Sequence, residues 1–118
     1  MVLLFALCCM VGWAEPATAA RLASVEGEAG ETEVRDAEDF KLGDQTEVEI
    51  SYKVTAKNDD CSVVVRLYRE QNGRWLVVNT VLRTSSAANG SRTLTLPAGS
   101  YRVEVVAKQA RYHVTVDN

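Results

Sequence analysis

The chain has 118 residues, a formal net charge of −3 and 47% apolar residues. This length is enough for one small domain and not for two. The charge balance lacks the basic surplus of a nucleic-acid-binding protein, so no nucleic-acid partner is expected.

Residues 1–19 have the features of an export signal. The apolar run VLLFALCCMVGW is too short to span a bilayer comfortably. It is followed by Pro16 and by Ala17-Thr18-Ala19, the small-x-small pattern that signal peptidase accepts, although no Lys or Arg precedes the run. We predict cleavage after Ala19, with cleavage after Ala14 or an uncleaved anchor as alternatives. The protein is then secreted or periplasmic, and it meets a membrane only through this signal.

Removing these 19 residues from 118 leaves 99 residues and one cysteine, Cys61. A single cysteine forms no internal disulfide, so stability must come from a buried core. Cys61 has the strand parity of Val63 and Val65, which predicts a buried apolar role. The alternative is an intermolecular disulfide.

Charge is divided unevenly along the chain. Residues 20–49 contain ten acidic and three basic residues, whereas residues 50–118 contain five acidic and ten basic residues. The acidic segment 20–38 is poor in large apolar side chains, which predicts a disordered leader. The alternatives are that this leader lies against the basic body, or that the body holds an external polyanion.

Residues 39–118 alternate between apolar and polar residues in the way that β-strands do. In TEVEISYKVT, for example, Val48, Ile50, Tyr52 and Val54 share one face. Segments of the same kind follow, separated by turn residues: CSVVVRLYRE, RWLVVNTVL, SRTLTL, YRVEVVAK and ARYHVTV, with FKLG at 40–43 as a short strand. No segment has a helical period. The pattern predicts an all-β domain over 39–118, an antiparallel β-sandwich of about seven strands with Greek-key or jelly-roll-like connections.

The segment LTLPAGSYRVEVV predicts a corner between two strands. Pro97 has no N–H for a sheet ladder, Gly99 adopts positive φ at low cost, and Tyr101 begins the next strand. A tyrosine at this place packs its ring in the core while its hydroxyl bonds to backbone near the turn.

Together, DDCSVVVRLYRE, LTLPAGSYRVEVV and ARYHVTV resemble the C-terminal half of bacterial pre-peptidase C-terminal domains, and DFKLGDQTEVEISYKV resembles their first strands. Fibronectin type III-like sandwiches share a comparable Pro-Gly-x-Tyr corner. The resemblance covers roughly residues 38 to 116. It implies an accessory, non-catalytic module of a secreted protein that aids binding or secretion. Such modules normally accompany a catalytic domain, and no catalytic motif is found in these 118 residues.

Strand parity also predicts a basic binding surface. Three strands, 61–70, 101–108 and 110–116, are expected side by side in one sheet. Their outward side chains then form one cationic, partly aromatic patch made of Arg66, Tyr68, Arg102, Lys108, Arg111 and His113, with Glu104 among them. An anionic polysaccharide, an anionic lipid headgroup or an acidic protein segment would fit such a patch.

The segment YREQNGRW predicts a hairpin with a two-residue type I′ turn at Asn72-Gly73. This register places Glu70 opposite Trp75 and Tyr68 opposite Val77. It creates an outer apolar strip of Val64, Tyr68, Trp75, Val77 and Val81, which is a second candidate contact surface. A three-residue loop with a bulge would instead bury Trp75, and we favour the buried ring because large aromatic side chains are rarely left in water.

Metal and catalytic motifs are sparse. Asp59 and Asp60 in KNDDCS are candidate Ca²⁺ ligands, with Asp36, Glu38 and Asp39 as further oxygen donors if they lie near. No other cofactor is expected, and the absence of a nucleophile elbow, P-loop or zinc motif predicts that the protein is not an enzyme.

The sequence therefore predicts an exported, non-catalytic binding or scaffolding module that recognises an anionic polymer or surface through a basic strand face. The alternative is a protein–protein or inhibitory partner of a secreted enzyme, docking through the apolar strip.

Overall fold

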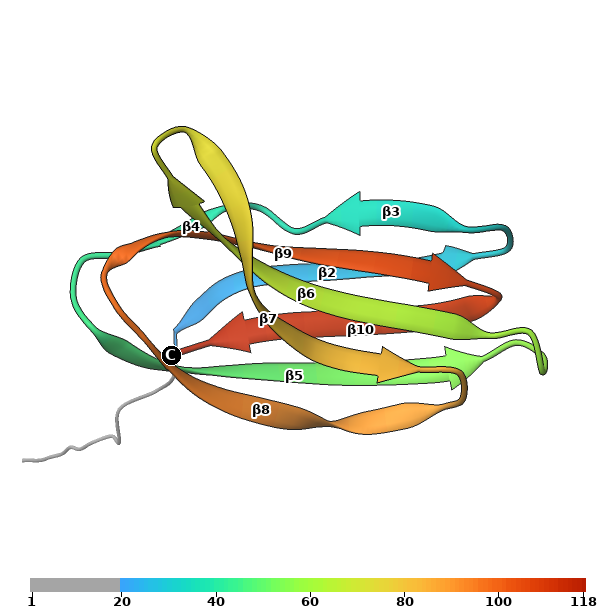
Figure 1. The fold of residues 1–118 in the computed structure, drawn as a ribbon. Helices are drawn as coiled ribbons and strands as arrows, with labels where there is room; N and C mark the ends of the chain where they lie inside the picture. The colour runs from blue at the N-terminus through green and yellow to red at the C-terminus, as the bar shows by residue number, and fades with distance from the viewer. Residues whose placement is uncertain (1–19) are drawn as a thin grey trace, which may run out of the picture.

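The computed structural model describes residues 20–118, and every regular element in this range is a β-strand (Figure 1). Within it, no helix is long and apolar enough to cross a membrane. The strands are β2 (Arg21–Ala29), β3 (Glu33–Asp36), β4 (Phe40–Leu42), β5 (Thr46–Ala56), β6 (Ser62–Gln71), β7 (Arg74–Thr84), β8 (Ala88–Leu96), β9 (Gly99–Lys108) and β10 (Ala110–Asp117).

These nine strands of residues 20–118 form two antiparallel sheets packed face to face. One sheet has the order β2-β10-β5-β8, and the other has the order β3-β9-β6-β7 with β4 also paired to β9. Apart from the β6–β7 hairpin, the neighbours in each sheet are not consecutive in the chain, as in the double Greek key of a jelly roll. The predicted antiparallel sandwich with jelly-roll-like connections is confirmed, with nine strands instead of about seven.

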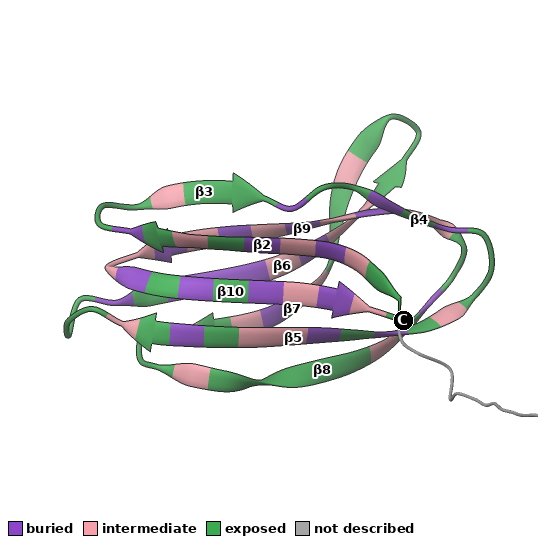
Figure 2. Cartoon of the chain, turned by 180° about the vertical axis from the view of Figure 1, so that it is seen from behind, coloured by how far each residue is buried: buried purple, intermediate pink, exposed green. Residues whose placement is uncertain are grey.

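The core lies between the sheets and follows the two-residue period of the sequence. Val48, Ile50 and Val103 are fully buried, and Val114 is 1% exposed. Along β10, buried and exposed residues alternate, which Figure 2 shows as a striped strand. Cys61 is buried at 3% exposure and free, as its parity predicted.

The segment 20–38 is not a disordered leader, and this prediction was wrong. It forms the edge strands β2 and β3, which pair with β10 and β9. The inward side of β2 carries small residues, and one of them, Gly27, leaves room for the Tyr112 ring: a Cβ there would lie 2.6 Å from the Tyr112 hydroxyl. The alternative, a leader lying against the basic body, matches the structure, because Glu28 forms ion pairs with Lys57 and Arg111. The predicted export signal, residues 1–19, lies outside the described residues.

The predicted tyrosine corner joins β8 to β9. Tyr101 is fully buried and its hydroxyl donates a hydrogen bond of 2.6 Å to the carbonyl oxygen of Pro97. Its ring stacks on Phe40 of β4 with centroids 5.6 Å apart. The hydrogen bond and the stacking fix where β9 begins, and they connect the corner to β4.

The β6–β7 hairpin has the predicted two-residue turn. Asn72 and Gly73 both have positive φ, 53° and 78°, as a type I′ turn requires, and Glu70 lies opposite Trp75. Trp75 therefore lies on the outer face and is only half-buried, so our preference for a buried ring was wrong. Two register shifts follow further along β7. Val81 comes after the first of them and lies in the core at 4% exposure, not in the predicted outer strip.

Candidate functional site

The six residues of the predicted basic patch lie on two opposite faces of the sandwich. β9 is the neighbour of β6, but β10 belongs to the other sheet. The outer face of the five-stranded sheet carries Arg66, Tyr68, Arg102 and Lys108, whereas the outer face of the four-stranded sheet carries Arg111 and His113. A single cationic patch of all six residues was therefore a wrong prediction, because strand periodicity gives the side of a strand but not the sheet to which it belongs.

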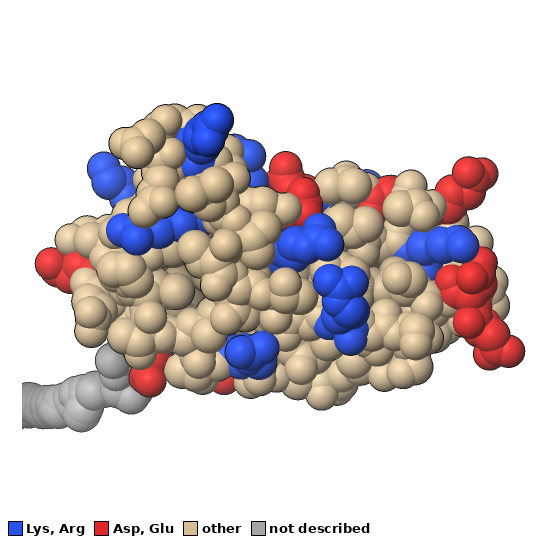
Figure 3. Space-filling model, in the orientation of Figure 1, with Lys and Arg blue, Asp and Glu red and all other residues tan. Residues whose placement is uncertain are grey.

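Most of these cations are also paired with carboxylates. Their ion pairs are Arg66–Glu104 at 3.4 Å, Arg102–Asp39 at 2.6 Å, Lys108–Asp60 at 2.9 Å and Arg111–Glu28 at 3.5 Å. Figure 3 shows the resulting surface of the five-stranded sheet, with separate blue side chains on a mostly tan face and red side chains toward its edges. Because these side chains are paired with carboxylates, they attract a polyanion less strongly than the sequence predicted.

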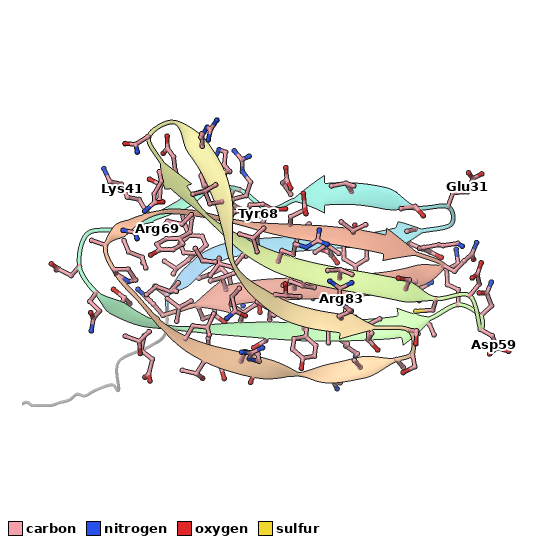
Figure 4. All side chains as sticks on the ribbon, in the orientation of Figure 1. Glu31, Lys41, Asp59, Tyr68, Arg69 and Arg83 are labelled. Carbon is pink, nitrogen blue, oxygen red and sulfur yellow. The ribbon has the colours of Figure 1, made fainter. Side chains whose placement is uncertain are left out.

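The face of the five-stranded sheet instead contains a small aromatic hollow. It encloses about 150 Å³ and is lined by Asp36, Tyr68, Trp75, Arg102 and Glu104. Four strands supply these residues: β3, β6, β7 and β9. Tyr68, labelled in Figure 4, lies on the outer side of β6 beside the hairpin end of the sheet. We call this site the aromatic hollow.

One wall of the hollow is the stacked pair Trp75 and Arg102. The Arg102 guanidinium carbon lies 4.2 Å from the centroid of the Trp75 ring, a cation–π contact. The same guanidinium donates to both carboxylate oxygens of Asp39, at 2.6 and 3.2 Å. Hydrogen bonding to Arg102 lowers the pKa of Asp39, and hydrogen bonding to Asp39 raises the pKa of Arg102. These two hydrogen bonds to one carboxylate hold the Arg102 guanidinium against the Trp75 ring.

The opposite wall is a second small network. The Tyr68 hydroxyl donates to Glu104 Oε1 at 2.9 Å, and Arg66 donates to the same oxygen at 3.4 Å. Partial burial raises the pKa of Tyr68, and the hydrogen bond to Glu104 raises it further. Tyr68 therefore stays a neutral phenol at physiological pH.

This arrangement offers three kinds of contact within one small space. Trp75 and Tyr68 present apolar ring surface, Asp36 and Glu104 present hydrogen-bond acceptors, and Arg102 presents donors. Strand parity predicted Tyr68 and Arg102 as binding residues with Glu104 among them, but it did not assign Asp36 or Trp75 to the same site. The hairpin register predicted from Asn72-Gly73 was the signal that placed Trp75 on this face.

Arg111 and His113 face a different surface, the outer side of the four-stranded sheet. A shallow hollow of about 370 Å³ there is bordered by His113 and Lys53 and by short polar side chains such as Ser51, Ser91 and Asn89. In the sheet register His113 lies between Glu26 and Lys53. Tyr52 also lines this hollow, but its ring packs against the core, and neither an arginine nor a carboxylate is among the lining residues.

The candidate Ca²⁺ ligands remain a prediction. Asp60 forms its ion pair with Lys108, and no group of three or more His, Cys, Asp or Glu side chains arranged for a metal is found in residues 20–118. A thermal shift on addition of Ca²⁺, lost in Asp59→Asn/Asp60→Asn, is the measurement that tests this site.

Similar folds are found among solved structures. The pre-peptidase C-terminal domain of the collagenase from Bacillus anthracis matches with a TM-score of 0.51 and 12% identity, over 80% of this chain and 88% of that chain. The VP2 subviral particle of infectious bursal disease virus (TM-score 0.49, 12% identity, 85% of this chain and 32% of that chain) and the C-terminal CBM6 of the laminarinase LamC from Zobellia galactanivorans (0.48, 10%, 85% and 97%) also match. This chain thus spans about a third of the VP2 chain.

No family model matches the chain, and no curated protein matches its sequence. The likeness to the collagenase domain, at 12% identity, is one of fold alone. It confirms at the level of fold the resemblance to pre-peptidase C-terminal domains that the sequence indicated.

Proposed function

We propose that the protein is an exported, non-catalytic binding module that holds a polyhydroxylated ligand, a saccharide, in the aromatic hollow. The observation that supports this proposal is that two aromatic rings and three charged side chains line one site: Trp75, Tyr68, Asp36, Glu104 and Arg102. Aromatic rings stack on the apolar faces of sugar rings, while carboxylates and guanidinium groups exchange hydrogen bonds with their hydroxyls. At about 150 Å³ the hollow is smaller than a drug-sized pocket, so it takes one ring of a longer chain.

The charge around the hollow favours a neutral saccharide over the anionic polymer expected from the sequence. Asp36, Asp39 and Glu104 outnumber Arg66 and Arg102, and both arginines are already paired. A sulfate or uronate group entering the hollow would displace one of these carboxylates or lie beside it. The ligand is therefore held mainly by contacts that salt does not screen.

A polyanion remains the second candidate because of one specific observation. Residues 71–98, which include β7 and β8, contain Arg74, Arg83 and Arg92 but no acidic residue. Arg83 is exposed, and it makes no ion pair with the carboxylates of residues 20–118 (Figure 4). These three arginines, which we call the basic surface, do not line the hollow and would bind a polyanion through charge alone.

Affinity electrophoresis of the purified protein in gels with neutral or acidic polysaccharides, at about 0.1 M and about 1 M salt, separates the candidates. We expect retention by a neutral polysaccharide that persists at high salt. Trp75→Ala and Asp36→Asn should weaken it at least about tenfold, because each removes one kind of contact. Asp44→Asn, an exposed carboxylate in the β4–β5 turn, is the matched control and should leave retention unchanged.

Two outcomes would overturn the saccharide proposal. Retention only by acidic polysaccharides, abolished at high salt and by Arg83→Gln, would show that the basic surface is the site. Retention equal in Trp75→Ala and the unsubstituted chain would show that the hollow takes no part.

A further inference from the structure

The hairpin end of β7 exposes apolar side chains next to one another. Leu76, Val77 and Val78 are 45%, 50% and 45% exposed, and Val34 of β3 is the other large apolar residue exposed in residues 20–118. In Figures 1 and 2 this end of the β6–β7 hairpin stands clear of the two sheets, and its residues are mostly exposed. A run of adjacent apolar residues exposed in this way marks a contact surface.

β7 is an edge strand, and only one half of its free edge is covered. Arg92 of β8 donates to the carbonyl oxygens of Thr80 and Val81, at 3.5 and 3.4 Å. An inward-pointing charge of this kind blocks the addition of another strand. No side-chain hydrogen bond within residues 20–118 reaches the backbone of residues 74–78, and this half contains no Pro or Lys.

The hairpin register fixes which backbone groups point to the free edge. Next to the two-residue turn, Gln71 and Arg74 form the first pair of the ladder, and such a flanking pair exchanges both of its hydrogen bonds. Because direction alternates along a strand, the N–H and C=O groups of Trp75 and Val77 point away from β6. These four groups form a short, regular template for another strand.

We propose that two copies of this chain associate by pairing residues 74–78 of β7 antiparallel, about a two-fold axis at Leu76. Trp75 and Val77 of one copy then exchange hydrogen bonds with Val77 and Trp75 of the second. Leu76 meets Leu76 of the second copy across the axis, and each Arg74 lies opposite Val78. The two Arg74 side chains are at opposite ends of the pairing, so no like charges face each other.

The choice of a second copy follows from this self-complementarity. A two-fold interface uses the same patch on both subunits, so its sequence must match itself when reversed. Residues 75–77 do so with apolar residues against apolar residues and with an aromatic residue against a β-branched one, a favourable cross-strand pair. The pairing also covers the three apolar side chains that each monomer leaves exposed.

Pairing at β7 joins the two five-stranded sheets into one, which brings two aromatic hollows to the same continuous surface. This consequence rests on the proposed function: a polysaccharide that presents repeated rings would then bind both hollows, and with higher avidity than one. The pairing itself needs no ligand.

Sedimentation velocity of the purified protein without ligand, at about 10 µM to 1 mM, tests the pairing. The overlap is short, so we expect a dimer that forms within this range and is insensitive to salt. Leu76→Lys places two charges at the axis, and Val77→Pro removes an N–H that points to the free edge but none that bonds β6. Both should weaken dimerisation at least about tenfold. Val34→Lys, an equally polar change at 61% exposure on β3, should not.

Cross-linking tests the register directly. Facing residues of a non-hydrogen-bonded antiparallel pair have Cα atoms about 4.5 Å apart, close enough for a disulfide. Leu76→Cys should therefore give a covalent dimer on mild oxidation, and Val34→Cys and the unsubstituted chain should not. A chain that stays monomeric to 1 mM, a dimer that Leu76→Lys leaves intact, or equal cross-linking at positions 34 and 76 would each overturn the pairing. Because no ligand is present, these results are independent of saccharide binding.

Discussion

Two pairs of an arginine and an aromatic ring lie back to back at one end of the sandwich, on opposite sides of the same sheet. Arg69 lies 6.0 Å from the centroid of Tyr101, and Arg102 lies 4.2 Å from that of Trp75. Tyr101 and Arg102 are neighbours on β9, so one points inward and the other outward. The inward pair is hydrogen-bonded to the backbone, since Arg69 donates to the Ala98 carbonyl oxygen at 2.8 Å. The outward pair is hydrogen-bonded to a side chain, since Arg102 donates to the carboxylate of Asp39.

The difference shows how one chemical pair serves two purposes. The inward ring, Tyr101, is fully buried and its hydroxyl bonds to the backbone at the β8–β9 corner, so this pair stabilises the fold. The outward ring is half-buried and lines the aromatic hollow, so it keeps surface for a ligand. Substitutions in the inward pair should change stability, and substitutions in the outward pair should change binding.

The largest expected effect comes from removing the two rings in turn. Tyr101→Ala should lower the free energy of unfolding by about 3–5 kcal/mol, because it empties a fully buried ring site. Trp75→Ala should lower it by about 1 kcal/mol or less, because that ring is partly exposed and loses mainly its cation–π contact. Urea denaturation of both variants measures the two values.

Tyr101→Phe separates the ring from its hydroxyl. It keeps the packing against Phe40 and removes only the bond to Pro97, which should lower the free energy of unfolding by about 1 kcal/mol. Equal losses in Tyr101→Ala and Trp75→Ala would show that the inward and outward pairs do not differ in the way proposed.

The inward pair was largely predictable from sequence because its determinants are local. Pro97, Gly99 and Tyr101 follow one another within five residues, and the turn residues Asn72 and Gly73 likewise set the hairpin register by themselves. The outward pair depends on Asp39, which precedes Arg102 by 63 residues, and on β4 and β9 being neighbours. No periodicity in a single strand contains that information.

The two larger errors have separate causes. β2 alternates Ala23, Val25, Gly27 and Ala29 with more polar residues, so a strand signal was present, but its small apolar residues and the many acids nearby resembled a disordered segment. These small residues are what an edge strand needs when a ring such as Tyr112 packs over it. The position of β10 in the opposite sheet follows from crossover connections, which strand periodicity does not contain.

A smaller effect is expected at the glycine beside the inward pair. Gly99 has φ of 156°, and a Cβ there would lie 2.9 Å from Arg69 Nε. Gly99→Ala should therefore displace Arg69 and lower the free energy of unfolding by about 1–3 kcal/mol, the usual range for overpacking. Gly43→Ala is the control, since a Cβ there has open space around it. Unchanged stability in Gly99→Ala would mean that Arg69 is not held at the corner.

The smallest expected effect is the pH dependence of the outward pair. Hydrogen bonding to Arg102 lowers the pKa of Asp39 in the folded protein. A carboxylate with a lowered pKa stabilises the fold above its unfolded pKa of about 3.9, and this contribution is lost as pH falls through the folded pKa. The Asp39 side chain is 48% exposed, so solvent screening keeps the contribution below about 1 kcal/mol.

The stability of Asp39→Asn relative to the unsubstituted chain, measured by urea denaturation from neutral pH to below pH 4, isolates this carboxylate. The difference in the free energy of unfolding should be constant near neutrality and should shrink in acid. The NMR signal of the Trp75 indole N–H should shift over the same pH range, because Arg102 loses the carboxylate that holds it on the ring. The buried Tyr101 ring has no carboxylate partner, so its signals should stay in place until the fold itself opens. A Trp75 signal that does not move as Asp39 is protonated would show that Arg102 stays stacked without its carboxylate, and the outward pair would then be held by the ring alone.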